Sequence, residues 1–114
     1  MKKVFCFDID NTICLTKGID YRFSRPKKKI IKLINKLFDS GHTIKIFTAR
    51  YMGRNNENVK IAKKQGYNFT YKQLKKWNLK FHKLIFGKPT FDFLIDDKSI
   101  DFNTNFEEKL KKFL

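Results

Sequence analysis

The order of short apolar runs along the chain constrains its fold most. Runs at residues 4–9, 43–47, 81–86 and 91–95 each have the length of a single strand. Strand-like and helical segments alternate along most of the chain. This pattern is typical of a parallel sheet with both faces covered. We therefore predict an α/β fold, a three-layer Rossmann-like parallel sheet with helices on both faces.

Cap and turn residues locate the predicted helices. Pro26 suits the start of a helix and Gly41 its end, and residues 11–25, which lack a helical period, are predicted to form a loop or small hairpin. The predicted helices are, in chain order, residues 27–40, a short helix from Asn55 or Asn56 to Gly66, one that begins near the capping box Thr70-x-x-Gln73, and one that begins near Thr104-x-x-Glu107 and carries Phe106, Leu110 and Phe113.

Length and composition define one domain, residues 1–114, with no room for a second one. No apolar run reaches the length of a membrane span, and the first residues do not resemble a secretory signal, so we expect a cytoplasmic protein. Cys6 and Cys14 lack the spacing of a zinc site and are expected to be buried, reduced thiols.

The formal net charge of +15 raises the question of a nucleic-acid partner. The basic residues are mostly lysines on the polar faces of predicted helices, whereas base readout and bidentate phosphate binding favour arginine. The only arginines are Arg22, Arg25, Arg50 and Arg54. This balance disfavours a nucleic-acid partner.

Polar side chains follow the predicted strands where those strands end. Asp8 and Asp10 follow the first strand, Thr48 the second, and Asp96 and Asp97 the fourth. In an open α/β sheet, ligands bind beyond the carboxyl ends of the strands, so these groups are expected to converge. Several carboxylates in one cleft need a cation, and oxygen ligands without His or Cys favour Mg²⁺. Taken singly, the first pair would also fit solvated strand-end acids and the last pair a turn.

Four motifs in order resemble the haloacid dehalogenase superfamily of phosphotransferases. "DIDNT" matches its first motif, Thr48 in "IFTARYMGR" its second, Lys88 in "FGKP" its third, and Asp96-Asp97 in "LIDDK" its fourth. The resemblance covers residues 4 to about 100. At a finer level, the chain is similar to small phosphatases of bacterial capsule and surface-polysaccharide biosynthesis. Asn11 stands where the family usually has Gly, and Asn is the next best residue for a left-handed backbone.

The resemblance implies a role for each matching residue. Asp8 would attack phosphorus and Asp10 would act as general acid and then base, while Thr48 and Lys88 would contact the phosphoryl group. The implied Mg²⁺ ligands are Asp8, Asp10, Asp96 and Asp97. The implied substrate contacts are Asn11, Thr12, Thr48, Ala49, Arg50, Arg54 and Lys88.

The spacing between motifs leaves no room for a cap domain, so the resemblance is to the capless, minimal type. Such an open site suits a bulky substrate or closure by a neighbouring subunit in a homo-oligomer. The expected reaction is Mg²⁺-dependent hydrolysis of a phosphorylated sugar or a small phosphorylated capsule precursor. Two alternatives stay open: a polynucleotide 3′-phosphatase, and a non-catalytic binding domain that has kept the fold.

Overall fold

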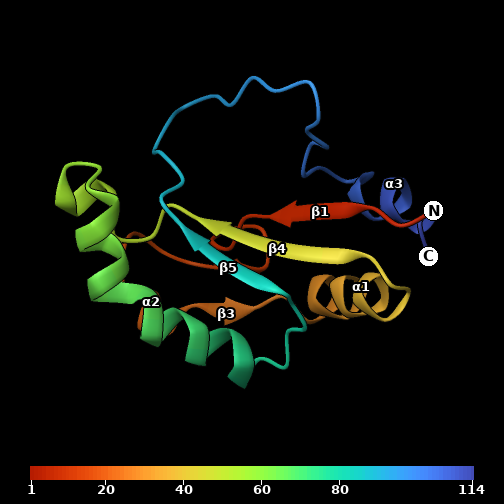
Figure 1. Ribbon diagram of the computed structural model, residues 1–114, viewed down its shortest axis with the longest axis horizontal. Helices are drawn as coiled ribbons and strands as arrows, with labels where there is room; N and C mark the ends of the chain where they lie inside the picture. The colour runs from red at the N-terminus through yellow and green to blue at the C-terminus, as the bar shows by residue number, and fades with distance from the viewer.

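Three parallel strands form the central sheet of the computed structural model, which describes residues 1–114. The strands are Val4–Phe7 (β1), Thr43–Thr48 (β4) and Lys83–Phe86 (β5), in the spatial order β1-β4-β5 (Figure 1). Phe7 lies opposite Ile46 in one ladder, and Ile46 lies opposite Leu84 in the other. All three strands are parallel, so their carboxyl ends meet at one edge, as predicted.

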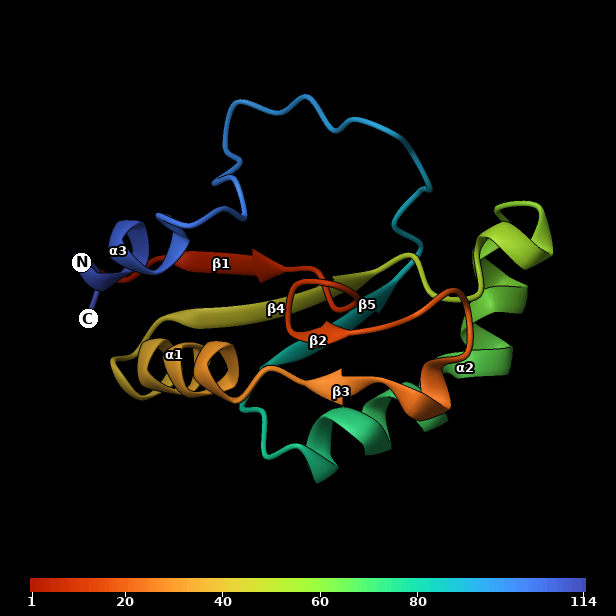
Figure 2. The same cartoon turned by 180° about the vertical axis from the view of Figure 1, so that it is seen from behind.

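A small hairpin follows β1. Cys14–Leu15 (β2) pairs antiparallel with Arg25–Pro26 (β3), and the 3₁₀ turn Tyr21–Phe23 (η1) lies between them (Figure 2). The prediction of a loop or small hairpin over residues 11–25 is confirmed. The hairpin returns the chain to the N-terminus of the first long helix, where the backbone N–H of Lys27 donates a hydrogen bond to the carbonyl of Ile13 at 2.8 Å.

Three α-helices complete the fold: Lys28–Asp39 (α1), Val59–Lys76 (α2) and Phe106–Lys111 (α3), with a 3₁₀ turn at Gly53–Asn55 (η2). The prediction of two helices between residues 55 and 77 is wrong, because α2 is continuous. Its N-cap is Asn58, whose side chain accepts a hydrogen bond from the N–H of Ile61 at 3.1 Å. None of these helices has the length and apolar character needed to cross a membrane.

Gly66 lies inside α2 and does not end it. A Cβ atom at this position would come within 2.2 Å of carbons of the Tyr51 ring. Tyr51 itself has a positive φ of 67°, an uncommon conformation for a bulky residue. The glycine therefore makes room for an aromatic ring. The prediction that Gly66 ends a helix is wrong.

The helices cover one face of the sheet only. Along β4 the side chains alternate between fully buried (Ile44, Ile46) and half-buried (Lys45, Phe47), and Phe7 and Phe86 lie on the buried face. Cys6 on β1 points to the other face and is exposed, so the predictions of a buried Cys6 and of helices on both faces are wrong for this structure. Figure 1 looks onto the open face, and Figure 2 shows α1 and the hairpin in front of the opposite face.

The predicted fourth strand, residues 91–95, is not formed. Beyond Lys88 the chain arches away from the sheet on the free side of β1 and returns to it only at α3 (Figures 1 and 2). The side chains of Phe93 and Ile95 are 87% and 96% exposed. β1 therefore remains an edge strand, with one row of backbone groups unpaired.

Candidate active site

A cleft of about 480 Å³ opens at the carboxyl ends of the strands. Asp8 and Asp10, which follow β1, line it together with Arg50, Arg54 and Lys88. Two carboxylates and two accessible cations, Lys88 and Arg54, thus face one space, while the Arg50 side chain is buried beneath it. Such a cleft suits a ligand that carries negative charge and reacts with an oxygen nucleophile.

Asp8 and Lys88 form a half-buried ion pair in this cleft. The Nζ atom of Lys88 lies 3.4 Å from Oδ1 of Asp8, and the two side chains are 17% and 33% exposed, respectively. Burial raises the pKa of the Asp8 carboxyl above its ordinary value, and the ammonium of Lys88 is the largest influence in the opposite direction. Asp8 is accordingly a partly desolvated carboxylate with one cation beside it and one side open to the cleft.

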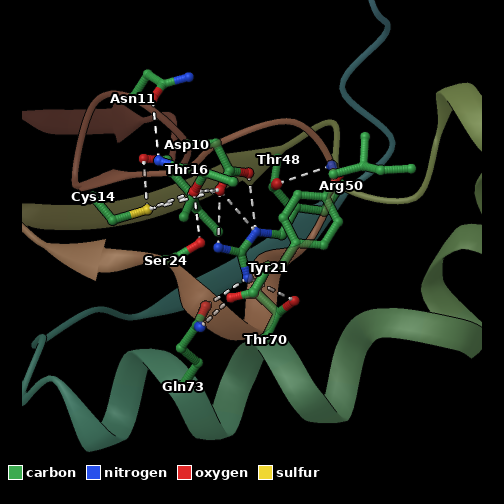
Figure 3. Close-up of polar contacts among 12 residues, drawn as sticks. Asp10, Asn11, Cys14, Thr16, Tyr21, Ser24, Thr48, Arg50, Thr70 and Gln73 are labelled. Carbon is green, nitrogen blue, oxygen red and sulfur yellow. Dashed lines mark hydrogen bonds and ion pairs between the residues drawn. The ribbon is translucent and has the colours of Figure 1, made fainter.

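Asp10 is held by a buried arginine (Figure 3). Arg50 donates from Nη2 to Oδ1 of Asp10 at 2.9 Å and from Nε to Oδ2 at 3.0 Å, a bidentate pair. The Arg50 side chain has no exposed surface, whereas 22% of that of Asp10 is exposed. The hydroxyl of Thr16 donates a further hydrogen bond to Oδ1 at 2.6 Å. The carboxylate of Asp10 therefore has a fixed position and orientation.

A second layer of polar residues fixes Arg50 in turn. Its Nη1 donates to Oε1 of Gln73 at 2.7 Å, and its guanidinium lies 4.5 Å from the centre of the Tyr21 ring. Gln73 also donates to the backbone carbonyl of Tyr21 at 2.7 Å, which ties α2 to the hairpin. Thr70 lies one turn earlier on α2, with its hydroxyl 3.5 Å from Nη1.

Sequence reasoning missed the roles of Thr16, Thr70 and Gln73. The predicted capping box Thr70-x-x-Gln73 is wrong, because both residues lie in the interior of α2, where their spacing of three residues puts both on one helix face. In the sequence, a polar pair at this spacing on an otherwise apolar, core-facing side of a helix indicates a buried polar partner.

Of the other predicted substrate contacts, Ala49 lines the cleft, whereas Thr48, Asn11 and Thr12 do not. The Thr48 side chain is fully buried, and its hydroxyl accepts a hydrogen bond from the N–H of Arg50 at 3.1 Å. Asn11 has a φ of 63°, which confirms the expected left-handed turn, and its side chain accepts from the N–H of Thr16 at 3.2 Å.

The two arginines predicted to contact substrate differ in their surroundings. Arg50 is fully engaged with Asp10 and α2, so its position makes it a support for Asp10. Arg54 is exposed at the mouth of the cleft, where Nη2 donates to the carbonyl of Ile19 at 2.8 Å and the guanidinium lies 4.6 Å from the centre of the Tyr51 ring. Of the two, only Arg54 is placed to meet a ligand that enters.

Asp96 and Asp97 do not reach this cleft. Both are exposed on the arched segment and neither lines the cleft; the Oδ1 atom of Asp96 accepts from the N–H of Lys98 at 2.9 Å, a local turn. No three side chains of the type that binds metal come together in the chain. Asp8 and Asp10 instead have Lys88 and Arg50 as counter-ions. A single chain in this arrangement does not offer the expected Mg²⁺ ligand set.

Comparison with known proteins gives one informative result. No family model matches the sequence, and neither does any curated protein. The chain is similar to a crystal structure of a structural-genomics target from Vibrio cholerae, with 26% identity, 98% of each chain covered and a TM-score of 0.81. The α/β fold with its parallel sheet is therefore shared with a natural protein over nearly the whole chain.

Proposed function

We propose that this chain hydrolyses phosphomonoesters by way of a phosphoryl group carried on Asp8. The observation that carries the proposal is the placement of Asp8, partly exposed in the cleft with Lys88 3.4 Å away. A nucleophile must be reachable by its substrate, and a phosphate must be approached by a cation before an anionic oxygen can attack it. The motif order and the parallel sheet agree with this reading.

The proposed reaction has two steps. An oxygen of Asp8 attacks phosphorus and the bond from phosphorus to the leaving oxygen breaks, while Asp10, which enters this step as the carboxylic acid, gives the leaving oxygen its proton. Asp10 then takes a proton from water, the water oxygen attacks phosphorus, and the bond to Asp8 breaks to release inorganic phosphate. Lys88 balances the charge of the phosphoryl group throughout. Arg50 and Thr16 act on the reaction only through Asp10, by holding its carboxylate.

The carboxylates that one chain gathers do not form a site for the expected Mg²⁺. Measuring phosphate release with Mg²⁺ and with EDTA tests whether the reaction requires this ion. For the substrate we propose a phosphorylated sugar or a small phosphorylated precursor of a capsule or surface polysaccharide. The cleft volume of about 480 Å³ accommodates a small ester, and exposed Arg54 at its mouth is available to a second anionic group.

The test is release of phosphate from a panel of esters, measured with Mg²⁺ and with EDTA. The panel contains sugar phosphates, amino-alcohol phosphates, nucleotides and a 3′-phosphorylated oligonucleotide. Asp8→Asn should abolish release, whereas Asp39→Asn, which alters an exposed carboxylate outside the cleft, should not. Release from the oligonucleotide alone would favour the polynucleotide phosphatase. No release from any ester by the folded protein would favour the binding domain.

A further inference from the structure

The arched segment and the edge of β1 are two unsatisfied features on the same side of the molecule. Residues 91–95, with the sequence FDFLI, have exposed side chains, among them Phe93 at 87% and Ile95 at 96%. β1 has no partner on its outer edge. An apolar segment of strand length beside a free sheet edge is the arrangement that leads to strand addition.

The alternation of side chains is compatible with a register that extends the covered face. Phe5 and Phe7 point to the helix-covered face of the sheet, where the Phe113 ring lies 5.2 Å from that of Phe5 and the Phe106 ring 6.5 Å from that of Phe7. If residues 91–95 paired in parallel with Ile95 opposite Phe7, then Phe93 would lie opposite Phe5. Both apolar side chains would then extend the covered face, because neighbours in register share a face.

This register has a consequence at the cleft. Asp96 follows Ile95 as Asp8 follows Phe7, so parallel pairing places Asp96 directly beside Asp8 and Asp97 one residue further. Pairing in the opposite direction would carry Asp96 toward the amino end of β1, away from the cleft. Only the parallel arrangement adds carboxylates to the site.

A chain cannot make this parallel pairing with its own β1. Lys88 is fixed at the carboxyl edge of the sheet, with its N–H bonded to the carbonyl of Thr48 at 3.1 Å. The three residues from Lys88 to Phe91 span at most about 11 Å. The route from beyond β5 to the outer side of β1 crosses about 14 Å, at roughly 4.8 Å per strand, and the strand must also start about 13 Å back toward the amino end. The arch in fact runs opposite to β1 (Figures 1 and 2).

The geometry points to strand exchange between two copies of this chain, in which residues 91–95 of each copy add in parallel to β1 of the other. Charge supports a second copy as the occupant. Residues 91–103 hold four carboxylates and one lysine, a net charge of −3, so the remainder of the +15 chain carries +18. The acidic arm of one copy therefore meets the strongly basic body of the other.

The consequence for the cleft rests on the proposed function: each site would combine Asp8 and Asp10 of one copy with Asp96 and Asp97 of the other. Four carboxylates would then line each cleft, and carboxylate oxygens are ligands of the kind that Mg²⁺ prefers. The exchange is isologous, so a dimer completes two sites.

The first test uses Cys6, whose side chain is exposed on β1. In the proposed register Leu94 lies opposite Cys6 on the open face, within the Cα separation that a disulfide spans. Mild oxidation of Leu94→Cys should give a covalent dimer on a non-reducing gel. The dimer should disappear in Leu94→Cys/Cys6→Ser and be weak in Ser99→Cys, a control on the arm beyond the strand. A disulfide within one chain, or no disulfide, would overturn the proposal.

The second test separates the exchange from the activity. Inactive Asp8→Asn and Asp96→Asn chains, unfolded and refolded together, should regain about a quarter of wild-type phosphate release, because half the dimers are mixed and each holds one intact site. Cross-linking without activity in any protein, wild type included, would leave the exchange standing and remove the proposed function. An active wild type without regain in the mixture would overturn the shared site.

Discussion

Replacing Arg50 by Met tests the buried ion pair on which the geometry of Asp10 depends. The substitution removes the guanidinium but keeps an unbranched side chain of similar reach. It deletes the three hydrogen bonds to Asp10, at 2.9, 3.0 and 3.3 Å, and leaves Oε1 of Gln73 without its donor at 2.7 Å. Tyr21 loses its cation partner at the same time.

The size of the effect follows from the burial of the two groups. Removing one member of a fully buried ion pair costs about 3–5 kcal/mol, because the other charge is left uncompensated. Asp10 retains 22% of its side-chain exposure, so water compensates it in part. We therefore expect Arg50→Met to lower the free energy of unfolding by about 2–4 kcal/mol, a large share of the 5–15 kcal/mol typical of a domain.

Urea denaturation followed by circular dichroism measures this change. Arg54→Met is the matched control: this arginine is exposed and hydrogen-bonded only to a backbone carbonyl, so its loss should cost no more than about 0.5 kcal/mol. In a double-mutant cycle, Asp10→Asn with Arg50→Met should be less destabilising than the sum of the single changes. A loss below about 1 kcal/mol for Arg50→Met, or strict additivity in the cycle, would show that this ion pair does not stabilise the position of Asp10.

Three further predictions follow from single contacts. Because burial raises the pKa of Asp8, phosphate release should fall off on the acid side at a pH above the ordinary value of 3.8, and Lys88→Met should move this limb to still higher pH. The same raised pKa penalises the folded state as pH rises through it, so Asp8→Asn should be more stable than wild type at pH 7 in EDTA and lose that advantage below pH 3.8, as thermal melts would show. Gly66→Ala should lower the free energy of unfolding by about 1–3 kcal/mol by displacing Tyr51, while Lys64→Ala on the exposed side of α2 should not, and equal urea midpoints for the two would contradict this.

The sequence alone predicted the parts of the site that depend on strand ends. Parallel strands bring their carboxyl ends together whatever their loops do, so the meeting of Asp8, Asp10 and Lys88 followed from order along the chain. The left-handed turn at Asn11 was predictable for a similar reason, since its conformation is local.

The remainder depends on contacts between distant segments. Nothing near Arg50 in the sequence distinguishes a buried support from a substrate ligand; the difference lies in Gln73 and Tyr21, which arrive from α2 and the hairpin. The apolar run at 91–95 resembles a strand in sequence, but a strand needs a neighbour within reach. Lys88 is held at the carboxyl edge of the sheet and lies only three residues before Phe91, so residues 91–95 cannot reach β1 of the same chain as a parallel neighbour.

Phosphoryl transfer to Asp8 is the most direct test of the proposed chemistry. The protein is mixed with a substrate ester, quenched in acid, digested and analysed by mass spectrometry. We expect a peptide that contains Asp8 and is heavier by about 80 Da, the mass of one phosphoryl group, and we expect no such peptide from Asp8→Asn. Turnover of the ester with no such adduct, or with the adduct on another residue, would exclude Asp8 as the nucleophile.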